Sequence, residues 1–101
     1  MADASITLYR GSASTTAGTV LYTSPSNIAV TVTNVAITNT TTAAVTATLN
    51  LATVALVSSL SVPANSTQFI DMDQVIYNGE TITGSASTTA VNFHISGNEI
   101  Y

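Results

Sequence analysis

The chain has almost no basic residues. Arg10 is its only lysine or arginine, and charged residues make up 6% of the sequence, against about 25% in a typical globular domain. Proteins that bind nucleic acids or anionic membranes need several basic side chains to neutralise phosphates or lipid headgroups. The formal net charge of −4 has the opposite sign. We therefore expect a protein that contacts neither nucleic acid nor a membrane.

Cysteine is also absent, which excludes disulfides and thiolate chemistry and leaves the redox compartment open. The N-terminal segment MADASITLYR has neither the basic region nor the apolar stretch of a secretory signal, so we expect no signal peptide. The longest apolar run, around residues 51–57, is interrupted by Thr53. It is far shorter than the roughly 20 residues of a membrane-spanning helix.

Aromatic residues are scarce: there are two Phe and no Trp, so the core must consist mainly of Val, Ile and Leu. What the chain has in abundance is hydroxyl groups, from 19 Thr and 12 Ser. Thr, Val and Ile favour strands, and strong helix formers such as Lys and Glu are nearly missing. The composition indicates an all-β protein, and the length suits a single domain over residues 1–101.

Short segments of alternating polar and apolar residues are separated by turn residues such as Ser24-Pro25, Pro63-Ala64-Asn65 and Asn78-Gly79. The expected strands are residues 5–10, 19–23, 28–39, 44–51, 54–62, 66–72, 75–77, 80–86 and 89–96, with a short tail from Gly97. This pattern predicts a single antiparallel β-sandwich of about eight to nine short strands, and a jelly roll is one arrangement that fits it.

The alternation also predicts which side chains are buried. The expected core consists of Ile37, Val45, Leu49, Phe69, Ile82, Val91, Phe93 and Ile95. In the segment 28–39 the apolar residues change from even to odd positions near Thr33-Asn34. One extra residue would produce that change, so we expect a bulge, a bend or a strand buried on both faces there.

Few residues could carry chemistry. His94 is the only imidazole, lies on the polar side of its strand, and has no nucleophile or orienting acid at a suitable spacing. Asp71 and Asp73 flank Met72 and supply two oxygen donors, whereas calcium needs six to eight. Glu80 follows Asn78-Gly79 and is interpreted as a turn residue. We predict no catalytic residues, no metal site and no cofactor.

The heptapeptide GSASTTA occurs twice, at residues 11–17 and 84–90, and each copy lies where one expected strand ends and the next begins. It would either present equivalent loops on duplicated hairpins or be a coincidence in a chain rich in Ser, Thr and Ala. Asn39 and Asn65 each begin a glycosylation sequon, which has little meaning without a signal peptide.

The expected sheet edges are poorly protected. Free-standing β proteins guard edge strands with lysine, inward charges, proline or bulges, and this chain has no lysine and only Pro25 and Pro63. Its surface must be mostly Thr, Ser, Asn and Ala, which can be buried without desolvating many charges. We infer that neighbours in a larger assembly cover much of it, including copies of the same chain.

Several segments together resemble one family, the small β-sandwich virion proteins of tailed bacteriophages. They are residues 21–25 (LYTSP), 35–40 (VAITNT), 62–67 (VPANST), 79–82 (GETI) and 91–100 (VNFHISGNEI). The resemblance implies a non-enzymatic structural protein of the virion, made in the host cytoplasm. We expect a multi-copy capsid decoration protein bound to the major capsid protein. Attachment to neck or tail proteins, as an accessory or fibre protein, is the alternative.

An alternative from another class is a carbohydrate-binding or adhesion module. Sugar platforms use exposed aromatic rings, for which Tyr9, Tyr22, Tyr77 and Tyr101 are the candidates. These four tyrosines are scattered along the sequence, which weakens this hypothesis.

Overall fold

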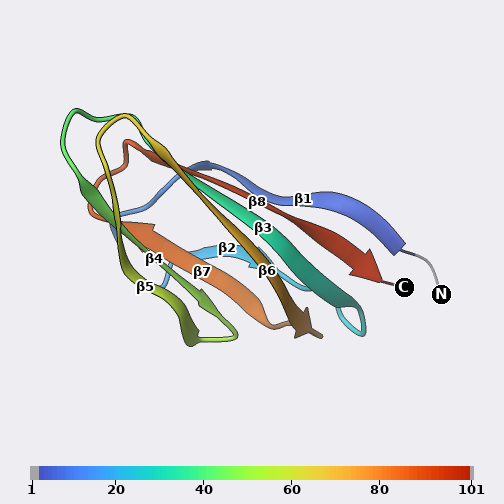
Figure 1. Cartoon of the computed structure of the whole chain (residues 1–101). Helices are drawn as coiled ribbons and strands as arrows, with labels where there is room; N and C mark the ends of the chain where they lie inside the picture. The colour runs from blue at the N-terminus through green and yellow to red at the C-terminus, as the bar shows by residue number, and fades with distance from the viewer. Residues whose placement is uncertain (1–2, 101) are drawn as a thin grey trace.

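A computed structural model describes residues 3–100, in which eight antiparallel strands form two four-stranded sheets packed face to face (Figure 1). The strands are β1 (Asp3–Ser12), β2 (Val20–Thr23), β3 (Ala29–Asn39), β4 (Val45–Leu51), β5 (Val54–Val62), β6 (Thr67–Tyr77), β7 (Thr81–Ala86) and β8 (Val91–Ile100). None of the described residues belongs to a helix that is long and apolar enough to span a membrane.

The first sheet, here called sheet A, has the strand order β1-β8-β3-β6, and sheet B has the order β2-β7-β4-β5. Strand β1 therefore pairs with β8, β2 with β7, β3 with β6 and β4 with β5. This nested pairing is the connectivity of a jelly roll. The predicted antiparallel β-sandwich is confirmed, and the jelly roll is the arrangement it adopts.

The largest departures from the sequence-based expectation are in two strands, β6 and β8. The segments 66–72 and 75–77, expected as separate strands, form one strand, β6. The expected tail from Gly97 continues β8 to Ile100. In both places the segment lies beside β3, which pairs with β6 on one side and with β8 on the other along most of its length. The long partner strand thus supplies backbone hydrogen bonds that local sequence cannot reveal.

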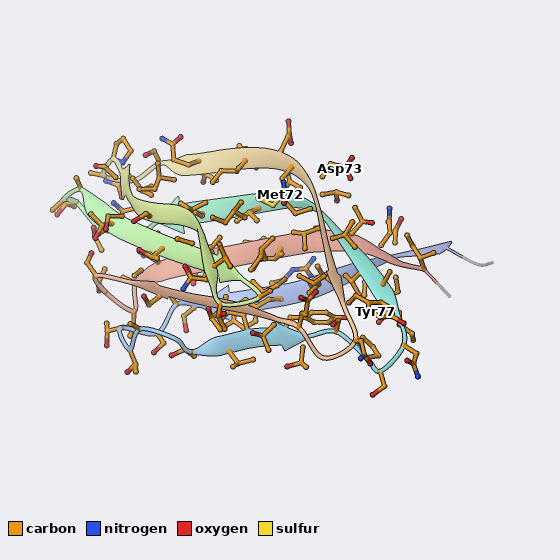
Figure 2. The ribbon with its side chains drawn as sticks, turned by 90° about the horizontal axis from the view of Figure 1, so that it is seen from below. Met72, Asp73 and Tyr77 are labelled. Carbon is orange, nitrogen blue, oxygen red and sulfur yellow. The ribbon has the colours of Figure 1, made fainter. Side chains whose placement is uncertain are left out.

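The predicted irregularity near Thr33 is a bulge, and it belongs to a line of bulges across sheet A. Thr33 is an extra residue relative to β8, Leu8 in β1 is another, and Met72-Asp73 in β6 lie opposite Thr33 alone. Bulges increase twist and bend a sheet locally. Figure 2 shows β6 bending beside Met72 and Asp73 before it reaches Tyr77.

The core lies between the sheets, and seven of the eight predicted core residues are buried in it. The prediction for Phe69 is wrong, because its side chain is 72% exposed. In β6, Ile70 lies opposite Val35 and packs on the core, so alternation turns the adjacent Phe69 to the outer face. The pair Phe69-Ile70 is apolar on both sides of the strand, so its sequence does not reveal which residue faces inward.

The β4–β5 hairpin has a strained loop of two residues, Ala52 and Thr53, with φ of 49° and 65°. Positive φ at both positions is typical of a type I′ turn, which strongly prefers Asn-Gly. For an alanine and a β-branched threonine this conformation is unfavourable.

We therefore predict that Ala52→Asn combined with Thr53→Gly raises the free energy of unfolding by ~1–2 kcal/mol. Urea denaturation would measure the gain. Thr42→Gly is the matched control, since Thr42 is exposed and its φ is not positive. Glycine should bring no gain there, and an equal gain from both changes would contradict the strain argument.

Candidate interaction surface

The residues that could carry chemistry do not meet in one place. His94 lies exposed on the outer face of β8, as predicted, opposite Arg10 of β1 and Ala36 of β3. The Asp71 carboxylate accepts a hydrogen bond of 2.9 Å from Asn34 Nδ2. Between residues 3 and 100, no three His, Cys, Asp or Glu side chains are grouped as metal ligands, and no pocket is found.

Asp71 and Asp73 both lie on the outer side of β6. Asp71 lies in the regular ladder opposite Asn34, whereas Asp73 lies in the bulge of β6. Both are exposed, and Met72 between them packs against the core (Figure 2). The predicted placement of both carboxylates on one side of the strand is thus confirmed, and the bulge removes Asp73, but not Asp71, from the regular pairing with β3.

Glu80 has the structural role that the sequence suggested. Its Oε1 accepts a hydrogen bond of 2.8 Å from the Tyr77 amide, which closes the turn between β6 and β7. Ser24 supports the same turn from the other side: its hydroxyl donates to the Glu80 carbonyl and accepts from the Gly79 amide, both at 3.1 Å. Ser24 is buried, and these bonds satisfy its polar group inside the fold.

One end of the sandwich consists of four connecting loops that carry no charged residue. The loops are residues 13–19, 40–44, 63–66 and 87–90, and most of their side chains are Ser, Thr or Ala. Charged side chains lie instead on sheet A and near the opposite end, where Glu80 and Glu99 are found. This uncharged loop end can therefore approach another protein without desolvating an ion.

The two copies of GSASTTA meet at the loop end. The first leads from β1 to β2 and the second from β7 to β8, so both cross from one sheet to the other. The Ala86 amide donates to the Ser14 carbonyl at 2.9 Å. The third residue of each copy, Ala13 or Ala86, is buried in the core. The repeated segments thus form two adjacent crossings, and in each the third residue is a buried alanine.

Asn39 holds the loop end together, and its role was missed in the sequence. Its side chain is 1% exposed. Its Nδ2 donates to the carbonyls of Ala43, Val62 and Pro63 at 2.8–3.1 Å, and its Oδ1 accepts from the Thr41 amide at 2.8 Å. The carboxamide therefore joins the β3–β4 loop to the end of β5. Because Asn39 is buried, its sequon is not an exposed glycosylation site.

We predict that Asn39→Ala lowers the free energy of unfolding by roughly 2–4 kcal/mol, because the change removes the buried carboxamide that donates to the Val62 carbonyl and accepts from the Thr41 amide. Thermal denaturation with a calorimeter would measure the loss. Asn92→Ala is the matched control on the outer face of sheet A and should change stability by less than ~0.5 kcal/mol. A similar loss for both variants would show that the buried network is not what stabilises this end.

The three tyrosines between residues 3 and 100 do not form an aromatic platform. Tyr9 packs on the core edge and donates to the Ser12 carbonyl at 2.8 Å, and Tyr22 donates to Glu99 Oε2 at 3.1 Å. Tyr77 is 48% exposed, near the end of β6 (Figure 2). Tyr101 lies outside the described residues.

Large apolar side chains are exposed on three of the four edge strands. Phe69, Val75 and Tyr77 lie on β6, Val54 and Leu56 on β5, and Val20 on β2. In an isolated domain these side chains contact water, and apolar groups beside unpaired strand edges are typical of surfaces that other protein chains cover. The edge strands are therefore the candidate functional surface. Sequence reasoning indicated unprotected edges but could not say which strands form them.

No family model, curated protein or solved structure matches this chain.

Proposed function

We propose that the protein is a non-enzymatic structural component of a tailed-phage virion, present in many copies as a capsid decoration protein. The observation that carries the proposal is the combination of a small jelly roll with exposed apolar edges and an uncharged loop end. Such a surface suits lateral contact with a protein shell, since its burial desolvates few charges. The sequence segments that resemble small β-sandwich virion proteins support the same assignment.

A location on the outside of the capsid suits the charge. With one basic residue and a net charge of −4, the chain would be repelled by packaged nucleic acid. On the outer surface the same negative charge would keep particles soluble and mutually repelling. The partners would be the major capsid protein and other copies of this chain.

Quantitative mass spectrometry of purified particles tests the proposal through copy number. Capsid decoration predicts hundreds of copies per particle, comparable with the number of major capsid subunits. A dozen copies or fewer would instead support the alternative, a neck or tail accessory or fibre protein. If purified particles contain none of the protein, the virion assignment is wrong.

The carbohydrate-binding alternative gains no support from the placement of the tyrosines described above. A glycan array probed with the purified protein would test it. Specific binding to any glycan would argue for an adhesion role in place of capsid decoration.

A further inference from the structure

The two edges of sheet A run in opposite directions. Strand β1 is antiparallel to β8, β8 to β3 and β3 to β6, so β1 and β6 are antiparallel to each other. The β1 strand of a second molecule can therefore lie antiparallel beside β6 of the first without turning the molecule over. Repetition of this step would extend sheet A from one molecule into the next.

The register brings complementary side chains to the same level on these two edges. Across the outer face of sheet A, Arg10 lies opposite His94, His94 opposite Ala36, and Ala36 opposite Phe69. The next row of outward-facing residues across the sheet begins at Thr7 in β1, passes through Ser96 and Asn34, and ends at Asp71 in β6. The only basic residue thus lies on one edge, and an exposed aromatic ring with a carboxylate beside it lies at the same height on the other edge.

Both sets of side chains are available for contact. Arg10 is exposed, and the hydrogen bond found for its guanidinium is a long one, 3.5 Å, to Thr7 Oγ1. Phe69 is 72% exposed. Asp71 is also exposed and uses one carboxylate oxygen to accept the bond from Asn34. A guanidinium placed over an aromatic ring and near a carboxylate gains both a cation–π interaction and an ion pair.

We infer that copies of this chain associate head to tail, with the β1 edge of one molecule against the β6 edge of the next, and with Arg10 seated on Phe69 beside Asp71. The occupant of the β6 edge is thus a second copy of the same chain. The contact is heterologous, so it forms a closed ring or an open filament according to the rotation between neighbours.

Charge disfavours the symmetric alternatives for this sheet. Two β6 edges paired around a two-fold axis would bring Asp71 and Asp73 of both molecules together. Two β1 edges would leave Arg10 away from the Asp71 carboxylate of β6. Like charges directly opposite each other destabilise a strand pair, whereas the head-to-tail contact joins opposite charges.

Sedimentation of charge-reversed variants would test this contact. Wild-type protein should form assemblies that grow with concentration and weaken as salt screens the ion pair. Arg10→Asp and Asp71→Arg should each weaken association at least about tenfold, because each places like charges on the two meeting edges. An equimolar mixture of the two variants should associate again, since each then meets its opposite charge. The double variant R10D/D71R should also associate.

A matched control adds a charge to the other sheet. Ser61→Asp places a carboxylate on β5, an edge of sheet B, and should leave association unchanged. Circular dichroism would confirm that each variant is folded.

Three results would overturn the inference: a wild-type protein that stays monomeric, a mixture that fails to restore association, or loss of association in S61D. The contact is a property of the purified protein. A monomer in solution would therefore leave the virion assignment standing, and absence from particles would leave the contact standing.

Discussion

Replacing Phe93 with alanine is expected to lower the free energy of unfolding by ~3–5 kcal/mol. The Phe93 side chain is fully buried and is the largest among the fully buried residues of the described chain. It lies in β8, between Gly11 of β1 and Ile37 of β3, and contributes to the core from the middle of sheet A. The second phenylalanine, Phe69, faces outward and does not contribute to this core.

A loss of this size would be a large part of the ~5–15 kcal/mol that stabilises a typical domain. Urea denaturation would measure it, at a protein concentration low enough to keep the chain monomeric. His94→Ala is the matched control, since His94 is the next residue of β8 and is exposed on the outer face. It should change stability by less than ~0.5 kcal/mol. Comparable losses would show that β8 faces the other way.

Alternation was enough to predict the orientation of β8 because the apolar residues of its first half fall only on odd positions. Val91, Phe93 and Ile95 are all buried, and His94 between them is exposed. The same signal fails in β6, where Phe69 and Ile70 are adjacent and both apolar. There the inward residue is chosen by the partner strand, since Ile70 pairs with Val35.

Local sequence analysis could not predict which distant strands pair, because pairing depends on the partner strand as well as on the strand itself. The all-β composition and the turn residues predicted a sandwich, but no local signal indicates that β1 pairs with β8 across 80 or more residues. The merging of two expected strands into β6 is also a consequence of pairing with β3. These features arise from long-range contacts, whose positions depend on how the sheets pack.

The sequence predicted that the interaction surface would consist of poorly protected strand edges, but not which strands would form it. The scarcity of charge indicated exposed, poorly protected edges. Which strands become edges follows from the topology, and so does the level at which Arg10 and Phe69 lie on opposite edges of sheet A.

The role of Asn39 could not be predicted from the sequence for a different reason. A buried asparagine and an exposed one look alike in sequence, and only the nearby carbonyls of the β5 end show why this one is needed.

Adding a single methyl group at Gly97 is expected to lower the free energy of unfolding by a large amount. Gly97 lies in β8 opposite Ile6 of β1 and Val32 of β3, at the line of bulges, and it is buried. A Cβ atom added there would overlap the backbone carbonyl oxygen of Thr31 and would come within 3.0 Å of Leu8 Cδ1. Leu8 could change its rotamer, but the Thr31 carbonyl belongs to the backbone of β3 and cannot move without disturbing the ladder between β3 and β8.

We therefore predict that Gly97→Ala destabilises the protein by at least ~3 kcal/mol, at the upper end of what overpacking of a core costs. The expected result is either a soluble protein with a much lower denaturation midpoint or a chain recovered mainly as insoluble material. Ser96→Ala is the matched control: Ser96 is exposed, and its variant should stay within ~0.5 kcal/mol of the wild type. Glycine is needed here for the close approach of two strands rather than for an unusual φ, since Gly97 is not among the glycines with positive φ. Wild-type stability in Gly97→Ala would mean that β3 and β8 are farther apart at the bulges than the structure places them, and the packing described for sheet A would then be wrong at this line.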